Sequence, residues 1–427
     1  MMKKWFAMLL ALMMVPCALA EGFDLSTQAQ QICTQLLSGD YAAVVSRFDE
    51  TMASALDETA LAQTMDGLAL QFGALQQVAD MQLAQAQNAA VFTLVYANGM
   101  LNLTIVLNDE AQIAGLLLQP AAQPQAEEKP LPEGVTETAL KLFAGTEREL
   151  SGSLITPAAA QAPYVVFVHG SGPSDMDETI GPNKPFRDLA YDLAALGVGS
   201  LRFDKMTFAH PELPCETVVQ EYLEPVREAL RVVRENAAPS RIILAGHSEG
   251  GMLAPWLVKE CGFDGGISMA GTPQALWEVS YAQNLALIDL MSEEMRAGQL
   301  ALVEAEKAKA EQLATLADDE LVFGISAVYQ RSIAELDQIT LAQESGKPFL
   351  FLWGDRDVQV SAEAFGLWQQ ALGENALCSF RIYPGLNHLF MPAQEDDSIL
   401  TVQAAYSRPS SVPAQVSEDL AEWIFQQ

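Results

Sequence analysis

The apolar residues of the chain change their pattern near residue 120. Residues 22–118 begin with apolar positions at helical spacing: Ala29, Ile32, Cys33, Leu36 and Leu37. A second helix is expected near Leu61–Phe72, and strand-like runs follow it: Leu75–Gln85, Ala89–Ala97, Met100–Leu107 and Ile113–Leu118. Asn98-Gly99 between two of these runs is a typical hairpin turn. Helices followed by an antiparallel meander predict a small α+β domain.

Residues 119–134 are rich in proline and polar residues and contain no aromatic side chain, which is typical of a semi-extended linker. From residue 135 to 427 the apolar runs have the length of buried strands, with edge strands expected within Thr146–Thr156. The other runs are Tyr164–Val168, Arg241–Leu244, Gly266–Ala270, Phe349–Trp353 and Ser379–Tyr383. This pattern predicts an α/β domain.

Residues 274–345 lie between two of the expected strands and are rich in Ala, Glu and Leu, which favour helices. We expect a helical insertion here that covers one edge of the sheet. Its bulky apolar residues either form the insertion's own core or line a pocket: Trp277, Tyr281, Met291, Met295, Phe323 and Tyr329.

A glycine-rich turn follows the run Arg241–Leu244 and leads into a helical stretch. It reads Ala245-Gly-His-Ser-Glu-Gly-Gly251, and a strand, G-x-S-x-G and a helix together form the nucleophile elbow of α/β-hydrolases. The turn is strained, so the residues two before and two after the serine must be small. Its position at a helix N-terminus favours negative charge. Ser248 is therefore the expected nucleophile, and an inert serine in an ordinary turn is the alternative.

Polar loops follow the last two expected strands, and in a parallel sheet these loops open at the same edge as the elbow. The first carries Asp355 and Asp357, and the second carries His388. The order nucleophile, acid, base is that of α/β-hydrolases. Asp357, three residues beyond Gly354, is the preferred acid, whereas Asp355 could instead cap the turn or pair with a neighbouring arginine.

The chain has four histidines, and only His388 has the position expected of the base. His169 belongs to another motif, His247 directly precedes the nucleophile, and His210 lies in a proline-rich loop.

The strand Tyr164–Val168 runs into His169-Gly-Ser-Gly-Pro173. A turn of this type supplies one backbone N–H of the oxyanion hole, and the residue after the nucleophile supplies the other. The expected donors are the amides of Ser171 and Glu249. The alternative is a glycine turn that serves only the geometry of the chain.

Taken together, several blocks resemble those of secreted bacterial α/β-hydrolase carboxylesterases with a small N-terminal NTF2-like domain. The blocks are His169–Asp175, Asp177–Phe186, Phe203–Lys205, Gly246–Gly251, Gly354–Val360 and Tyr383–Phe390. This family is related to serine aminopeptidase-type and dienelactone hydrolases. The resemblance covers the chain from about residue 137 onward and, more weakly, residues 22–118.

The resemblance implies an α/β-hydrolase fold with a helical cap, the triad Ser248, Asp357 and His388, and no cofactor or metal. The implied substrates are small neutral esters with short acyl chains, cleaved through an acyl-enzyme. Met206-Thr207 departs from the family, in which a basic residue is common at this point. Amide, peptide or thioester hydrolysis by the same triad stays open. A catalytically silent binding protein is the non-enzymatic alternative, which the intact triad disfavours.

The N-terminus resembles a signal peptide over residues 1–20. Lys3 and Lys4 precede an apolar stretch from Trp5 to Val15, and Ala18-Leu-Ala20 is a typical cleavage site. The apolar stretch is too short to span a bilayer. Pro16 stands where a lipobox before Cys17 needs a small residue, which argues against lipid anchoring. We therefore expect a secreted or extracytoplasmic protein.

The chain is strongly acidic, with 55 Asp and Glu against 23 Lys and Arg and a net charge of −32. Such a charge disfavours binding to nucleic acid and to anionic lipid, although it also serves solubility. We expect no stable membrane insertion after cleavage of the signal peptide. Beyond Cys17 the cysteines form no C-x-x-C motif, and their spacing fixes no pairing: Cys33, Cys215, Cys261 and Cys378. The sequence indicates no oligomeric state.

Overall fold

The structure is a computed structural model that describes residues 24–427 except 85–87, 97–98, 122–128 and 292. The signal peptide expected at residues 1–20, including Cys17, lies outside the described residues. Within them, no helix combines the length and the apolar character needed to cross a bilayer.

The chain divides into two compact units. One consists of Met1–Pro124 together with Leu400–Arg408, and the other of Gln125–Ile399 together with Pro409–Gln427.

The first unit places helices before a meander, as the sequence predicts. The helices are α1 (Leu25–Leu37), α2 (Tyr41–Val45), α3 (Glu50–Ala55) and α4 (Glu58–Phe72). The antiparallel sheet has the order β1 (Leu75–Ala84), β2 (Ala89–Tyr96), β3 (Gly99–Leu107) and β4 (Ile113–Pro120). Each of these four helices begins after an aspartate whose carboxylate accepts a backbone N–H of the first turn: Asp24, Asp40, Asp49 and Asp57.

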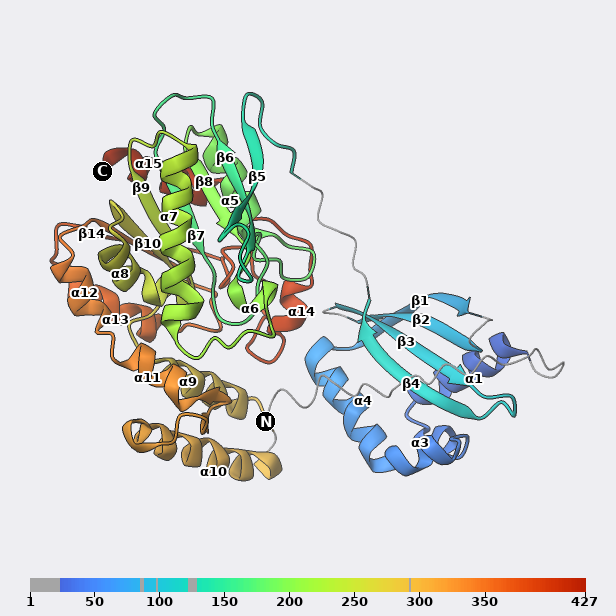
Figure 1. Ribbon diagram of the computed structural model, residues 1–427. Helices are drawn as coiled ribbons and strands as arrows, with labels where there is room; N and C mark the ends of the chain where they lie inside the picture. The colour runs from blue at the N-terminus through green and yellow to red at the C-terminus, as the bar shows by residue number, and fades with distance from the viewer. Residues whose placement is uncertain (1–23, 85–87, 97–98, 122–128, 292) are drawn as a thin grey trace. The chain divides into compact units, whose positions relative to one another are not determined.

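Burial alternates along the central strands of this unit. Phe92 and Leu94 on β2 are buried in one core with Ile32 and Leu36 of α1. The helices lie on that face of the sheet (Figure 1). The α+β prediction is thus confirmed, whereas the likeness to NTF2 stays a prediction.

The second unit is built on an eight-stranded sheet with the order β14-β13-β10-β9-β7-β8-β6-β5. The strands are β5 (Thr136–Leu142), β6 (Leu150–Thr156), β7 (Tyr164–Val168), β8 (Gly199–Phe203), β9 (Ile242–His247), β10 (Gly265–Met269), β13 (Phe349–Gly354) and β14 (Cys378–Tyr383). The six strands from β14 to β8 are parallel, β6 is antiparallel to β8, and β5 is antiparallel to β6. The predicted α/β sheet is confirmed. Of the residues given to edge strands, Thr146–Glu149 instead form the turn between β5 and β6.

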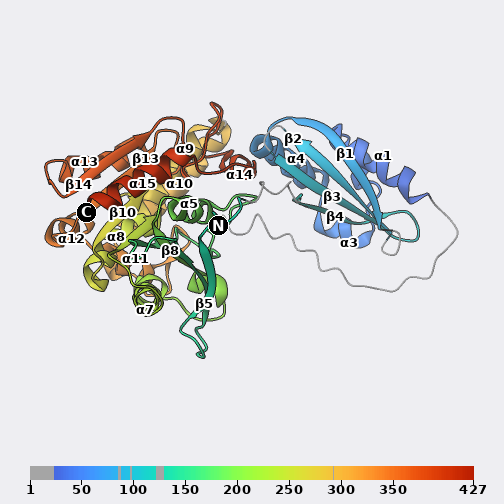
Figure 2. The same cartoon turned by 90° about the horizontal axis from the view of Figure 1, so that it is seen from above.

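Helices cover both faces of this sheet, so its central strands are buried on both sides. The helices α5 (Pro185–Ala195) and α15 (Ala414–Gln426) lie on one face, and α7 (Glu224–Asn236) and α8 (Glu249–Cys261) on the other (Figure 2). Phe167 of β7 packs against Phe186 of α5, with ring centroids 4.9 Å apart. Two covered faces explain why all five residues of β7 are buried and apolar.

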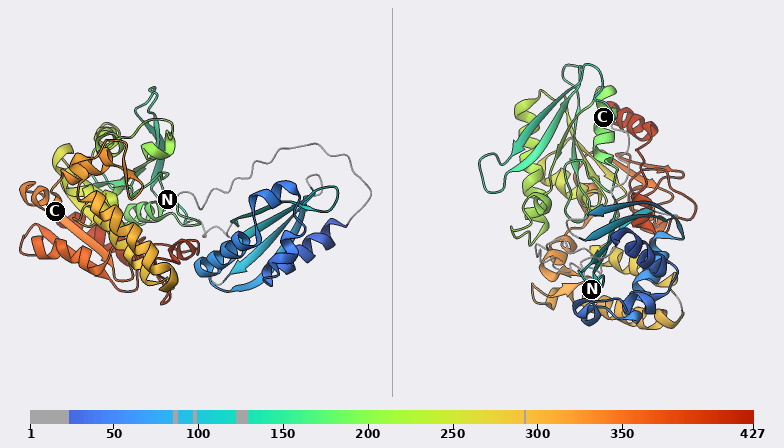
Figure 3. Two further views of the ribbon diagram at one scale, coloured as in Figure 1. Left: turned by 90° about the horizontal axis from the view of Figure 1, so that it is seen from below. Right: turned by 90° about the vertical axis from the view of Figure 1, so that its right-hand side faces the viewer.

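An insertion occupies the chain between β10 and β13. It contains α9 (Leu276–Asp289), α10 (Glu293–Ala310), α11 (Ala327–Ala334) and α12 (Gln338–Glu344), coloured gold to orange in Figure 3. A hairpin of two short strands, β11 (Leu321–Val322) and β12 (Ile325–Ser326), lies between the helices α10 and α11. Phe323 and Gly324 form its turn with φ of 49° and 82°, the positive angles that tight hairpins use. Trp277 and Phe323 pack into a small core of the insertion itself.

Candidate active site

The turn between β9 and α8 has the strained geometry that the sequence predicts. Ser248 has φ 53° and ψ −114°, which a non-glycine residue rarely adopts. A Cβ added to Gly246 would lie 2.1 Å from the carbonyl oxygen of Gly250, and one added to Gly250 would lie 2.5 Å from that of His169. Glycine is therefore required on both sides of the serine by the packing of backbone on backbone.

The loops after β13 and β14 bring an aspartate and a histidine together. His388 Nδ1 lies 2.7 Å from Asp357 Oδ2, and both side chains are buried. The other oxygen of Asp357 accepts the backbone N–H groups of Gln359 and Val360, at 2.8 and 2.9 Å. The carboxylate is thus held by its own loop on one side and presents its second oxygen to the imidazole.

The second aspartate of the loop has a different environment. Asp355 is exposed, and its Oδ1 accepts the backbone N–H of Gly385 at 2.6 Å. It therefore links the two loops but does not contact His388. Of the two carboxylates that the sequence offers, the structure brings Asp357 to the histidine.

A buried ion pair connects the elbow to the loop after β14, which carries His388 and is named the histidine loop. His247, the residue before Ser248, has Nε2 2.9 Å from the carbonyl oxygen of His388 and Nδ1 3.0 Å from Glu178 Oε1. Both partners are acceptors, so both ring nitrogens must donate, as in an imidazolium. Burial alone would lower the pKa of His247, but the Glu178 carboxylate outweighs it and the pKa is raised. Burial likewise opposes ionisation of Glu178, whose pKa is nevertheless lowered by His247.

The sequence predicts no role for either member of this ion pair. His247 directly precedes the expected nucleophile, and Glu178 lies in a block to which the resemblance assigns no function. No spacing rule joins residues 69 positions apart, so only the fold reveals the pair.

The loop after β7 lies against the nucleophile. A Cβ added to Gly170 would be 3.0 Å from Ser248 Cβ, and the Gly170 N–H donates to Glu178 Oε1 at 2.9 Å. Glu249 is the first residue of α8, where a backbone N–H has no acceptor within the helix. Among the described residues, no group accepts the Ser171 N–H. The Ser171 hydroxyl donates to Glu249 Oε2 at 2.7 Å, so the two expected oxyanion residues are joined through their side chains.

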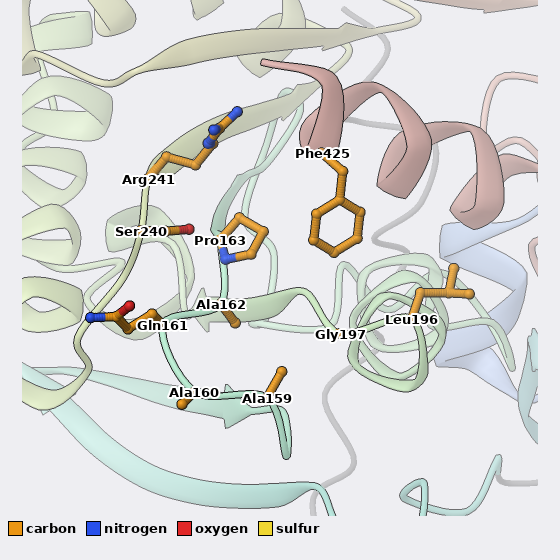
Figure 4. Close-up of a pocket in the computed structure, with 10 residues that line it drawn as sticks. All are labelled: Ala159, Ala160, Gln161, Ala162, Pro163, Leu196, Gly197, Ser240, Arg241 and Phe425. Atoms are coloured by element: carbon orange, nitrogen blue, oxygen red, sulfur yellow. The ribbon is translucent and has the colours of Figure 1, made fainter.

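Room for a small molecule exists beside the loop after β13, residues 355–361, which carries both aspartates and is named the acid loop. A cavity of about 700 Å³ extends between this loop and helix α9 of the insertion. Asp357 and Val358 line it from the loop, and Val279, Ala286 and Leu290 from the helix, whereas Ser248 and His388 do not line it. A second pocket, shown in Figure 4, is about 380 Å³ and includes Pro163, Gly197 and Arg241, which precede β7, β8 and β9. It therefore lies at the amino ends of the strands, opposite the edge that carries the elbow.

The part of the chain that the structure describes contains no group of three or more His, Cys, Asp or Glu side chains that could hold a metal ion. Its four cysteines are free thiols: Cys33, Cys215, Cys261 and Cys378.

Comparison with known proteins gives matches to two families. The Alpha/beta hydrolase family matches residues 165–400, and a family described as Protein of unknown function (DUF3887) matches residues 29–116. The chain is 29% identical over 398 residues to Esterase EstD of Thermotoga maritima, which covers 91% of this chain and 92% of that esterase.

Two solved structures are also similar to the chain. Est1E from Butyrivibrio proteoclasticus has a TM-score of 0.44 and 17% identity, with 68% of this chain and 99% of that chain covered. The acylaminoacyl peptidase of Pyrococcus horikoshii has a TM-score of 0.45 and 16% identity, with 82% of this chain and 56% of that chain covered.

The packing of the elbow predicts opposite effects for two glycine substitutions. Gly246→Ala forces backbone atoms apart and should lower the free energy of unfolding by about 1–3 kcal/mol or more. Gly366→Ala in α13 (Ala362–Leu372) meets nothing within 4 Å and should raise it by about 0.5–1 kcal/mol through helix propensity. Urea unfolding followed by circular dichroism measures both. Equal stability of the two variants would contradict the close backbone contact.

Proposed function

The chain belongs to the alpha/beta hydrolase family, and we propose that it is a serine hydrolase that cleaves small neutral carboxylic esters. The observation that carries the proposal is the buried hydrogen bond between His388 and Asp357, in loops tied to a strained elbow with Ser248 at its tip. These are the three residue types of the hydrolase triad in the chain order of this fold. The aligned region shared with Esterase EstD extends over nearly the whole of both chains, which also supports ester hydrolysis.

In the proposed mechanism, Ser248 attacks the ester carbonyl while His388 Nε2 takes the hydroxyl proton. Asp357 accepts the Nδ1–H of His388 at 2.7 Å, which fixes the tautomer and stabilises the imidazolium. The backbone N–H groups of Ser171 and Glu249 hold the negative oxygen of the tetrahedral intermediate. His388 returns the proton to the leaving alcohol, and the same residues then activate water to release the acid.

Two features support the proposed preference for small neutral substrates: the negative net charge of the chain and the apolar cavity beside α9. A net charge of −32 lowers the encounter rate with anionic substrates such as acyl-CoA, most strongly at low salt. The apolar side chains of α9 beside the acid loop suit a short acyl or alcohol group. Hydrolysis of amides or thioesters by the same groups is the alternative.

The proposal extends to the rest of the chain. Residues 1–20 direct export, residues 119–134 connect the units, and the N-terminal unit is an NTF2-like module without catalytic residues of its own. The residues of the insertion around α9 and α10 act as a cap over the substrate.

Ser248→Ala should lower kcat by about 10⁴–10⁶-fold with little change in stability, because it removes the nucleophile. A fluorophosphonate should label the wild-type enzyme at Ser248, as located by mass spectrometry of the labelled peptide. Labelling that persists in the Ser248→Ala variant would place the nucleophile elsewhere.

The two aspartates of the acid loop form a matched pair for testing the triad. Asp357→Asn should lower kcat by about 10⁴-fold, because an amide holds the wrong tautomer of His388. Asp355→Asn retains an oxygen that can accept the Gly385 N–H, so its kcat should fall by less than about tenfold. Steady-state rates on p-nitrophenyl acetate decide between them, and the reverse ranking would assign the acid to Asp355.

Substrate choice is tested with p-nitrophenyl esters from acetate to palmitate, an acyl-CoA and an aminoacyl-anilide. We expect kcat/KM to be highest for short esters and low for palmitate, acyl-CoA and the anilide. A preference of about tenfold or more for the thioester or the anilide, which is about 1.4 kcal/mol in the transition state, would overturn the ester assignment and leave the triad intact. Absence of any turnover and of fluorophosphonate labelling would favour the binding-protein alternative.

A further inference from the structure

Beside the proposed oxyanion hole lies a buried cation that the mechanism above does not use. Lys205, just after β8, is 2% exposed. Its Nζ donates to the carbonyl oxygen of Gly170 at 2.7 Å and to the Tyr222 hydroxyl at 2.7 Å, and lies 2.9 Å from Glu221 Oε1. All three hydrogens of the ammonium therefore have a partner. A buried ion pair is often no more stabilising than apolar residues of the same volume, so stability alone does not explain a lysine here.

The carbonyl that Lys205 holds belongs to the peptide that carries the proposed oxyanion donor. In a trans peptide the C=O of one residue and the N–H of the next point in opposite directions. The Gly170 carbonyl is drawn toward Lys205 and also accepts from Tyr222, whose hydroxyl is 3.0 Å away. The Ser171 N–H of the same peptide must then face away from Lys205. Gly170 itself lies against Ser248, so the peptide that carries this N–H borders the proposed nucleophile.

A ring of side chains fixes the same peptide from its other end. Ser171 donates to Glu249, whose second oxygen is 2.9 Å from the hydroxyl of Tyr329. That hydroxyl is 2.5 Å from Glu221, which pairs with Lys205. The ring thus closes back on the lysine.

The tyrosines of this cluster act as neutral hydroxyls. Burial, followed by the Glu249 carboxylate, raises the pKa of both Tyr222 and Tyr329 well above the ordinary value. Glu221 and Tyr222 are consecutive residues of a single π-helical turn, η3 (Val219–Leu223), a feature frequent at functional sites.

We infer that Lys205 is a positioning residue of the oxyanion hole: with Tyr222 it holds the Gly170 carbonyl, and thereby aims and polarises the Ser171 N–H. This inference rests on the proposed function. Hydrogen bonds in a chain polarise one another, so a cation on the carbonyl strengthens the N–H of the same peptide as a donor. The benefit is largest where negative charge develops on the substrate oxygen, so it belongs to the transition state more than to bound substrate.

The primary test is Lys205→Met, which keeps the length of the side chain and removes the ammonium. Loss of one whole oxyanion donor costs about 10²–10³-fold in kcat, so a misaimed donor should cost about 10–100-fold. KM for p-nitrophenyl acetate should change by less than about twofold. The affinity for an aliphatic trifluoromethyl ketone, which forms a tetrahedral oxyanion on the nucleophile, should fall by the same factor as kcat. A purely structural role would not link these two losses.

Two tyrosine variants test the same inference in case Lys205→Met does not fold. Tyr222→Phe removes the second donor to Gly170 and should lower kcat and ketone affinity together by about 3–10-fold, in line with one neutral hydrogen bond. Tyr191→Phe removes a hydroxyl that donates to Glu137 at 2.7 Å and touches no group of this cluster. Its kcat and ketone affinity should equal those of the wild type.

The outcomes separate this inference from the proposed function. A folded Lys205→Met enzyme whose kcat and ketone affinity stay within about twofold of wild type overturns the role of Lys205, while Ser248 labelling and esterase activity persist. A fall in kcat without a fall in ketone affinity overturns it as well. If Lys205→Met does not fold, equal kinetics of Tyr222→Phe and Tyr191→Phe overturn it. A wild-type enzyme that neither turns over esters nor reacts with a fluorophosphonate refutes the proposed function itself.

Discussion

The ion pair between Glu178 and His247 is the interaction on which the arrangement of the site depends. Glu178 accepts the N–H of Gly170 and pairs with His247, which donates to the carbonyl of His388. The loop after β7, the elbow and the histidine loop are thereby joined at one buried point. Breaking a buried ion pair by removing one partner costs about 3–5 kcal/mol. Two apolar residues could fill the space of Glu178 and His247. They could not pair with the N–H of Gly170 and the carbonyl oxygen of His388.

This arrangement follows from the topology of the sheet. The strands β7, β9, β13 and β14 are parallel, so the loops that follow them open at one edge. Convergence of four loops places many backbone polar groups away from water, and each needs a partner. Charged side chains such as Lys205 and Glu178 supply several hydrogen bonds from one position. The site therefore contains more buried charge than its proposed chemistry alone requires.

Local sequence was sufficient to predict the strands, the glycine turn at Ser248 and the two late loops, because each depends on neighbouring residues. It also favoured Asp357, although only the structure shows that Asp355 bonds to Gly385 instead of His388. Glu178 and Lys205 could not be predicted, since their partners lie far along the chain and are chosen by the fold. The hairpin at Phe323 was missed for another reason, because a two-residue strand has no detectable alternation.

The insertion has two regions with different physical constraints. Tyr329 on α11 is buried in the main core of the hydrolase unit and contacts the carboxylates of Glu221 and Glu249. Replacing Tyr329 would remove the partner of one buried oxygen on each carboxylate, Glu221 Oε2 and Glu249 Oε1, and leaving a buried acceptor unsatisfied costs about 1–3 kcal/mol. Helix α9 instead lines the cavity beside the acid loop with Val279, Ala286 and Leu290, where apolar side chains can be exchanged at little cost to the network. Sequence changes should therefore be tolerated better on the cavity-lining face of α9 than on α11, because Tyr329 of α11 contacts two buried carboxylates.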